Sequence, residues 1–398
     1  MYVTRPLSFY KKSAESLSLG PPEGPHSGIL VIQDDEVRPS CSSSPCFGEF
    51  HQLKVLPFPQ NRNIELFYRS GISLSRATHY RHVAFIPVLD KPLSSNLYYV
   101  IQLNERHRGD AFTSIEEEDL ETFCFYNSVP VEPHCQLDIS NEHQVFEVFP
   151  RRSKITFRKG FSAKPVAPHT FAPKFLSARW RVKVSDSVDS SLGEAAGVDN
   201  ALRARLPEFN FSMANTNPEA VVVGKWYCPL MFIKEGTHRT LRDEMRRSLF
   251  YEMTLQQRWE RVFSLENDRG TENRTVTVDV VVQKEKVVVA EREVETEEIE
   301  VEGVKWFKSC NNIGEESSVG LSTAIIERMK WEQVRFGWVE GKEKKVRIQK
   351  TEEFKGTGKW KRFGCYVLVE SFVLKRLDGS LVLTYDFKHH HQVRSKWE

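Results

Sequence analysis

The sequence predicts an α+β fold, built mostly from antiparallel β-sheets and hairpins with several amphipathic helices in two lobes. Three observations predict it. Short apolar runs of strand length alternate with turn-forming Pro, Ser, Asn and Gly residues. Other stretches carry apolar residues at helical spacing behind capping residues. A polar stretch at 185–200 separates two halves of a 398-residue chain that is long enough for two cores.

The first half of the chain is predicted to hold an extended arm and a β-rich lobe. Residues 1–27 are rich in Ser, Pro and Gly, which favours an extended N-terminal arm. In the N-terminal lobe, 28–190, Ser114 and Glu117 form a capping box that predicts one helix at 114–126. The predicted strands of this lobe are apolar runs bounded by turn formers: 29–33, 64–68, 83–89, 97–103, 145–149 and 180–184.

The C-terminal lobe, 191–398, is predicted to mix helices and strands. We expect one or two amphipathic helices in 238–266, because Leu255 and Trp259 lie one helical turn apart on an apolar stripe. A further helix is expected at about 319–335. Between the two helical regions, valines alternate with polar residues as in a half-buried strand: Val276, Val278, Val280 and Val282.

The last element is predicted to be a β-hairpin. The dipeptide Asp378-Gly379 is typical of a tight turn, and the resulting register sets Glu370 opposite Phe387. Because side chains alternate along a strand, His389 and His391 are expected on one face, opposite Leu368 and Tyr366, with His390 on the other face. The three histidines are therefore predicted to be ordinary strand residues.

Four residues of this hairpin form the first candidate ligand-binding site: Tyr366, Glu370, His389 and His391. A carboxylate beside two imidazoles could bind a metal ion or perform acid–base chemistry. The same groups could instead satisfy one another by hydrogen bonds at the margin of the sheet. The sequence leaves all three alternatives open.

A second candidate site is a basic segment near the C-terminus. Residues 335–363 hold ten basic and four acidic residues, a net charge of +6, whereas 291–302 hold seven Glu and one Arg, a net charge of −6. Both runs could lie on solvated strand faces. Alternatively, the basic segment offers an anion-binding or partner-binding patch around an aromatic ring, made of Lys359, Trp360, Lys361 and Arg362.

Motifs for common catalytic and metal sites are missing from the sequence. There is no G-x-S-x-G, H-E-x-x-H or Rossmann glycine pattern. The segment "KGTGKWKRFG" imitates a phosphate-binding loop, but Glu353 replaces its first glycine and Trp360 its magnesium-binding hydroxyl. Cys41, Cys46, Cys124, His134 and Cys135 include no C-x-x-C pair for zinc. We therefore predict no metal site and no cofactor.

Composition and charge limit the partners and the compartment. The chain is 40% hydrophobic and 28% charged with a formal net charge of +2, so no nucleic-acid partner is predicted. Its longest apolar stretch, 220–233, contains Lys225 and is too short to span a bilayer. The N-terminus lacks a secretory signal, and Glu15 disfavours a transit peptide. Seven scattered cysteines argue against a disulfide framework, so a cytoplasmic or nuclear protein is expected.

Several blocks of the chain resemble a plant-specific protein family of unknown function (domain of unknown function 1262). The blocks occur in the same order from the first residue to the last: "MYVTRPLS", "PPEGPHSG", "LPFPQN", "FIPVLDKPLSSNLYYVI", "GKWYCPLMFIKEGT", "MTLQQRWERVF" and "DGSLVLTYDFKHHHQVRSKWE". The resemblance implies a land-plant protein and implies no reaction, cofactor or catalytic residue. The family's end resembles His-x-His followed by Gln, which matches His389 and His391.

The function that these observations favour is non-enzymatic: an interaction protein or small-ligand-binding protein of plants, whose partner is a protein or a small molecule. The alternative is an enzyme, and a hydrolase that uses the C-terminal His/Glu cluster is the form it would take. Because active sites are assembled in space, missing motifs leave this alternative open.

Overall fold

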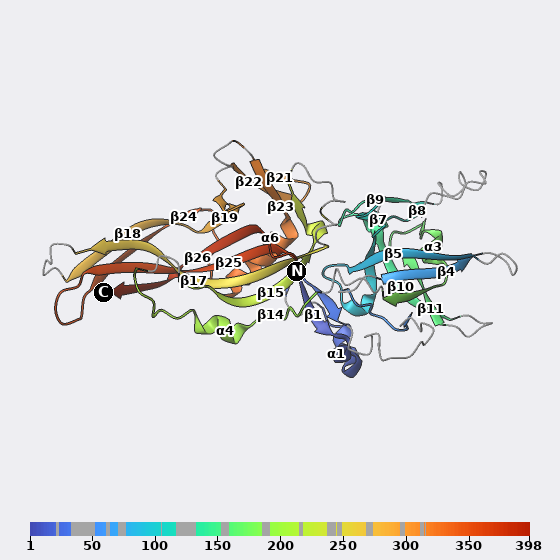
Figure 1. Cartoon of the computed structure of the whole chain (residues 1–398), viewed down its shortest axis with the longest axis horizontal. Coiled ribbons are helices and arrows are strands. Elements are labelled where there is room, and N and C mark those ends of the chain that lie inside the picture. The colour runs from blue at the N-terminus through green and yellow to red at the C-terminus, as the bar shows by residue number, and fades with distance from the viewer. Residues whose placement is uncertain are drawn as a thin grey trace, which may run out of the picture. The chain divides into compact units, whose positions relative to one another are not determined.

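The computed structural model describes most of the chain (Figure 1). The described residues are 1–20, 24–32, 52–60, 64–70, 77–104, 106–116, 133–152, 159–184, 192–214, 218–236, 244, 249–267, 274–294, 299–310, 314 and 316–398. They form two compact units. Unit 1 comprises Met1–Ala195, Pro229–Met231 and His238–Leu249, and unit 2 comprises Ala196–Cys228, Phe232–Thr237 and Phe250–Glu398.

Unit 1 is a strand-rich unit with short helices. Its helical segments are α1 (Leu7–Lys12), η1 (Ala14–Leu17), η3 (Leu93–Ser95), η4 (Glu142–Gln144) and α3 (Lys174–Ser177). Its strands are β1 (Tyr2–Pro6), β2 (Gly28–Ile32), β3 (Gln52–Leu53), β4 (Ile64–Ser70), β5 (Ala77–Pro87), β6 (Leu97–Gln102), β7 (Asp110–Phe112), β8 (Ile115–Glu116), β9 (His134–Gln136), β10 (Val145–Arg152), β11 (Lys159–Pro165), β12 (Thr170–Phe171) and β13 (Trp180–Val184).

The main sheet of unit 1 is antiparallel and closes on itself. Its strand order is β10-β11-β13-β4-β5-β6-β7-β9, and β10 also pairs with β6. The strands from β6 through β4 to β10 thus surround one core, in which Trp180 packs against Phe58, Phe85 and Phe161. Side chains on alternate residues fill this core, and the intervening ones point outward.

The N-terminal segment, predicted to be an extended arm, holds β1 in a parallel pair with β2. Met1, Tyr2 and Val3 are buried, and the Tyr2 hydroxyl donates a hydrogen bond to the Pro87 carbonyl at 2.6 Å. The first residues are therefore part of the packed structure of unit 1.

Unit 2 is organised around three long antiparallel strands (Figure 1). These are β17 (Phe250–Glu266), β25 (Arg362–Arg376) and β26 (Leu381–Trp397), in a sheet of order β15-β17-β25-β26-β19-β20. A second sheet has the order β16-β23-β22-β21, and β18 pairs with β24. The remaining elements are β14 (Gly197–Val198), α4 (Asn200–Arg205), β15 (Val221–Pro229), β16 (Ile233–Glu235), β18 (Thr275–Gln283), β19 (Glu285–Val289), β20 (Arg292–Glu293), β21 (Ile299–Val301), β22 (Val304–Cys310), β23 (Glu316–Ser322), α6 (Thr323–Arg335) and β24 (Lys345–Glu353). The first two residues of η5 (Leu230–Phe232) belong to unit 1 and its last residue to unit 2.

The predicted α+β class with several amphipathic helices is wrong, because the described elements are mostly strands. Among the helices that the structure describes, only α6 is longer than six residues. It forms where a helix was predicted at 319–335, although β23 occupies the first part of that range. A helix was also predicted at 114–126. The described part of that range contains strand β8, and the residues from 117 onward lie outside the described residues.

The clearest error concerns 250–266, where β17 takes the place of the helix predicted within 238–266. Glu244 is helical, and 238–243 and 245–248 lie outside the described residues. The apolar residues of β17 fit both periods: Leu255 and Trp259 are one helical turn apart, yet Met253, Leu255 and Trp259 also lie on one face of a strand. Pairing of β17 with β25 along its whole length decides for the strand, since both become interior strands of a buried sheet. None of the described helices is both long and apolar enough to cross a membrane.

Candidate functional site

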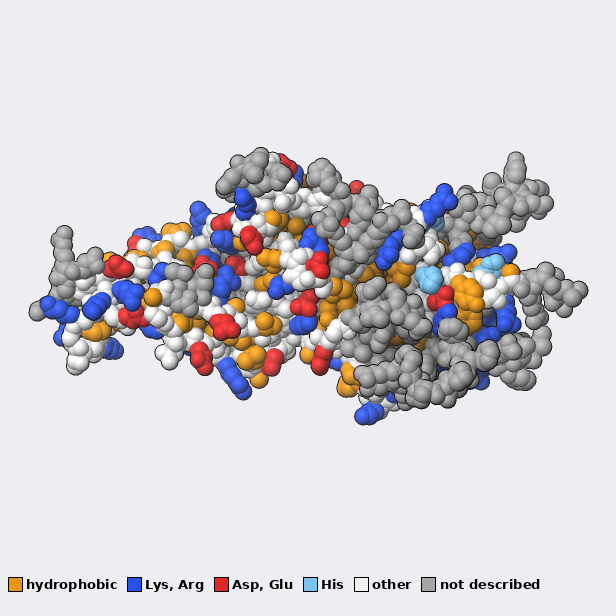
Figure 2. All heavy atoms as spheres, viewed as in Figure 1, with side chains coloured by type: hydrophobic (Ala, Val, Ile, Leu, Met, Phe, Trp, Pro, Cys, Tyr) orange, Lys and Arg blue, Asp and Glu red, His pale blue; other side chains and the backbone are white. Residues whose placement is uncertain are grey.

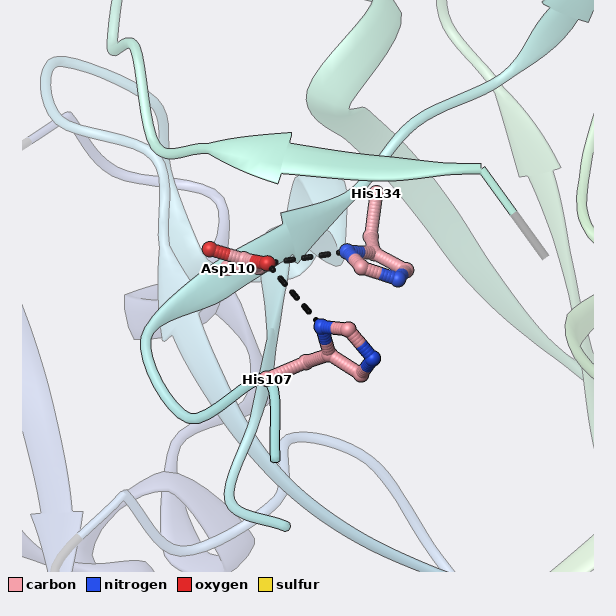
Figure 3. Close-up of side chains that lie close together, drawn as sticks. All are labelled: His107, Asp110 and His134. Carbon is pink, nitrogen blue, oxygen red and sulfur yellow. Dashed lines mark hydrogen bonds and ion pairs between the residues drawn. The ribbon is translucent and has the colours of Figure 1, made fainter. Parts of the chain in front are cut away.

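Two imidazoles and a carboxylate come together at the edge of the main sheet of unit 1 (Figure 3). The Nδ1 atom of His134 lies 2.9 Å from Oδ2 of Asp110, and Nδ1 of His107 lies 3.8 Å from the same oxygen. The two imidazole rings are 4.2 Å apart between centroids. One potential ligand atom from each residue lies within 4.8 Å of the other two.

Local structure brings His107 to Asp110. Both residues flank a turn in which the Asp110 N–H donates to the His107 carbonyl at 3.2 Å. Gly109 adopts a φ of 103°, in the region that glycine occupies at little cost, and its N–H bonds the Gln102 carbonyl. The turn therefore keeps the His107 side chain facing the carboxylate of Asp110, three residues later in the chain.

Strand pairing supplies the third residue. In the antiparallel pair of β7 and β9, Asp110 lies opposite Gln136 and Phe112 opposite His134. His134 is thus diagonal to Asp110 on the same face, within reach of its side chain. Solvent reaches all three side chains: those of His107, Asp110 and His134 are 42%, 30% and 17% exposed.

The arrangement is suited to a borderline transition-metal ion. Ligand atoms about 2.0–2.1 Å from a tetrahedral Zn²⁺ are about 3.3 Å from one another. The 2.9 Å and 3.8 Å separations from Asp110 lie on either side of that value, and all three ligand atoms lie within 4.8 Å of one another, so side-chain movement would have to bring the set together around an ion. Imidazole nitrogen suits Zn²⁺, Ni²⁺ and Cu²⁺, whereas Mg²⁺ and Ca²⁺ prefer sets of oxygen ligands.

Sequence reasoning missed His107 and Asp110 and considered His134 only together with cysteines. The structure separates His134 from Cys135, because neighbouring strand residues point to opposite faces and Cys135 accepts a hydrogen bond from Gln144. Cys41, Cys46 and Cys124 lie outside the described residues. The His-x-Gly-Asp turn was a usable local signal, but the pairing that adds His134 is not visible along the chain.

The predicted C-terminal cluster lies in unit 2, and the structure brings only part of it together. Leu368 pairs with His389 and Glu370 with Phe387, as predicted. A bulge then shifts the register, so Tyr366 pairs with Arg394 and the predicted pairing of Tyr366 with His391 is wrong. Tyr366 is buried beside Trp259 and Leu368 instead.

Glu370 belongs to a buried ion-pair network. Its carboxylate accepts from Arg203 Nε at 2.8 Å, from Arg203 Nη2, and from Gln257 Nε2 at 2.9 Å. Arg203 also donates to Glu332 Oε1 at 2.8 Å, and Arg328 lies 3.1 Å from the other oxygen of Glu332. The side chains of Arg203, Glu332 and Glu370 are at most 3% exposed. Arg203 was not predicted from the sequence.

His389 lies beside this network and is fully buried. Its Nε2 is 2.8 Å from Gln333 Oε1 and 3.9 Å from Glu370 Oε2. Burial lowers the pKa of the His389 imidazole from 6.5 to about 4, and the Glu370 carboxylate opposes that change. The ring of His391 lies 5.6 Å from that of His389, but His391 is exposed. The geometry favours a structural role for His389.

The difference in burial leads to a prediction for two of the three histidines. Replacing His389 with alanine should lower the free energy of unfolding by about 1–3 kcal/mol, because Gln333 loses its buried partner. Replacing exposed His391 should change it by less than about 0.5 kcal/mol. Urea denaturation of the two variants measures both values. Equal losses in the two variants would mean that the different burial of His389 and His391 does not determine their contributions to stability.

The second predicted site is divided by the structure. Trp360 is 5% exposed and packs against Trp397 at 5.1 Å, inside a small core that includes Val276 and Phe363. Lys359 and Lys361 are exposed, and Arg362 pairs with Glu398 at 2.8 Å. The ring that was expected to face a ligand is therefore a core residue, while the lysines point to solvent.

Comparison with known proteins finds a match of one segment to a family of unknown function and a distant structural likeness. A search of the curated proteins finds no match. The chain is similar to the crystal structure of Cry35Ab1, with 8% sequence identity, a TM-score of 0.47, and coverage of 85% of this chain and 90% of that chain. That likeness is too distant to assign a fold or an activity. Residues 23–125 match the family described as Protein of unknown function (DUF1262), a segment that includes His107 and Asp110 and ends before His134.

Proposed function

We propose that this chain is a binding protein whose ligand is a divalent transition-metal ion, held in unit 1 by His107, Asp110 and His134. The observation that carries the proposal is the convergence of three ligand atoms within 4.8 Å of one another. The His134 Nδ1 atom and Asp110 Oδ2 are now joined by a hydrogen bond of 2.9 Å, and metal binding would replace this bond by one bond from each residue to the ion, with release of a proton. With three protein ligands and partial exposure, a fourth position stays open for water or a small ligand.

Zinc should bind with one ion per chain at this site. Replacing His134 with alanine or Asp110 with alanine is expected to weaken Zn²⁺ affinity by more than about a hundredfold. Removing a residue that only supports a ligand costs about ten- to a hundredfold, so a larger loss identifies a ligand. Isothermal titration with ZnCl₂ measures the affinity and the stoichiometry. Visible absorption of Co²⁺-loaded protein reports tetrahedral coordination, and MgCl₂ should give no comparable signal.

His169→Asn is the matched control, because His169 is an exposed histidine of unit 1 and its φ of 58° is tolerated by Asn. This variant should bind Zn²⁺ like the wild type. Unchanged affinity in both site variants, or equal loss in the control, would contradict the proposal. In that case Asp110 only accepts a hydrogen bond from His134.

The proposal extends to the location and the role of the whole protein. We place the protein in the cytoplasm or nucleus of plants and regard its role as non-enzymatic binding of a small ligand or a protein. Against the alternative of a hydrolase stands the state of the C-terminal cluster, where Glu370 and His389 are 0% exposed and Glu370 is paired with Arg203. A substrate would have to displace this network to reach either group.

A further inference from the structure

The outward face of three neighbouring strands in unit 1 combines positive charge with aromatic rings. In the pairing of β13, β4 and β5, Arg181 lies opposite Phe67, and Phe67 opposite Tyr80. Lys183 lies opposite Glu65, which faces His82. These residues alternate with the inward-pointing core residues, so they share the outer face of the closed sheet. Figure 2 shows hydrophobic side chains flanked by basic and histidine side chains over β4 and β5.

The charge of this face is concentrated. Its basic residues are Arg69, Arg179, Arg181 and Lys183, and its acidic residue is Glu65, which gives a net charge of +3 on one face of a chain whose total is +2. Glu65 is only 11% exposed and is already paired with Lys183. The Glu65 carboxylate is therefore mostly buried, while Arg69 and Arg179 are exposed.

Two of the arginines adjoin one residue pair of β13 and β4. Trp180 pairs with Tyr68, Arg179 directly precedes Trp180, and Arg69 directly follows Tyr68. Both arginines are exposed, so they add to the positive charge that a polyanionic ligand would meet on this face.

The rings restrict the class of polyanion. Phe67 and Tyr80 lie 6.3 Å apart at 32°, and Tyr80 is 52% exposed. The Arg181 guanidinium lies 5.3 Å from the centre of the Phe67 ring. Adjacent aromatic rings on a sheet, with arginine planes beside them, are surfaces on which unpaired bases stack, while the surrounding cations contact phosphates. An acidic peptide would use the charges but not the rings.

We infer that the outer face of β4, β5 and β13 binds single-stranded nucleic acid. The charges that form it come from segments more than a hundred residues apart, which is why the nearly neutral sequence indicated no such partner. The inference concerns residues other than His107, Asp110 and His134 and does not depend on the proposed metal site.

Fluorescence anisotropy with labelled oligo(U) and oligo(dT), measured with EDTA present, tests the inference. Wild-type protein should bind both, with affinity that falls as salt rises. The double variant Arg69→Gln/Arg179→Gln should bind at least about tenfold more weakly with a shallower salt dependence. Tyr80→Ala should weaken binding by about tenfold through lost stacking. The control Lys344→Gln/Lys345→Gln removes the same charge from exposed positions before and at the start of β24 and should stay within about twofold.

Three results would overturn the inference. The first is no binding of either oligonucleotide by the wild type. The second is equal weakening in the Lys344/Lys345 control, which would mean that charge alone is responsible. The third is equally tight binding of polyglutamate with no effect of Tyr80→Ala, which would identify the face as a site for acidic proteins. Circular dichroism of each variant verifies that it folds, and Tyr80 is exposed enough for its removal to be tolerated.

Discussion

Replacing Arg203 with alanine is expected to lower the free energy of unfolding of unit 2 by about 3–5 kcal/mol, the cost of removing one partner from a buried ion pair. Arg203 bridges two carboxylates, Glu332 and Glu370, which are buried at 1% and 0% exposure. Its guanidinium also lies 4.2 Å from the centre of the Phe336 ring. Without Arg203, Glu370 keeps only the hydrogen bond from Gln257 among those described.

Tryptophan fluorescence during urea denaturation measures this effect selectively, because every tryptophan except Trp180 lies in unit 2. Arg205→Ala is the matched control: it removes the same side chain from the same helix α4, at an exposed position. The control should change the free energy of unfolding by less than about 0.5 kcal/mol. If the two variants lose equal stability, the network does not hold α4 against the sheet as the structure indicates.

Unit 2 is also expected to lose about 3 kcal/mol of stability through His389 alone as the pH falls from 6.5 to 4. In this window the buried imidazole stays neutral in the folded state, since its pKa is lowered to about 4, whereas it takes up a proton in the unfolded state at about pH 6.5. The unfolded state then binds more protons, so stability is complete above pH 6.5 and declines as the pH falls.

His389→Gln isolates this contribution, because glutamine can still hydrogen-bond to Gln333 but does not titrate. The difference in unfolding free energy between wild type and variant should change by about 3 kcal/mol across the window. His391→Ala serves as control and should keep most of the pH dependence, because burial is the largest cause of the lowered pKa of His389 and the nearby charge of His391 contributes less to it. A constant difference between wild type and His389→Gln would rule out His389 as the titrating group.

Some of the site was within reach of sequence reasoning. The Asp378-Gly379 turn predicted the hairpin and the pairing of Glu370 with Phe387 and of Leu368 with His389. Next to the turn Lys375 pairs with Leu381, one residue away from the predicted register, and the shift between Leu374 and Lys375 restores that register. The same reasoning failed for Tyr366 and His391. The bulge between Val367 and Leu368 leaves extra residues in β26 between His389 and Val393, and the alternation of apolar and polar residues in that strand does not predict it.

By itself, the sequence determined features that depend on neighbouring residues: the terminal hairpin turn, the alternating strand β18, and the presence of a helix at α6. These follow from local backbone preferences and side-chain period. Only the tertiary structure decided that β17 is a strand, because its place between β15 and β25 overrides local propensity. It likewise decided that Trp360 is a core residue, because the Trp360 ring packs against Trp397. It also decided the partners of Arg203, His134 and Arg181, since contacts between distant segments depend on how the strands pair and leave no periodic signal along the chain.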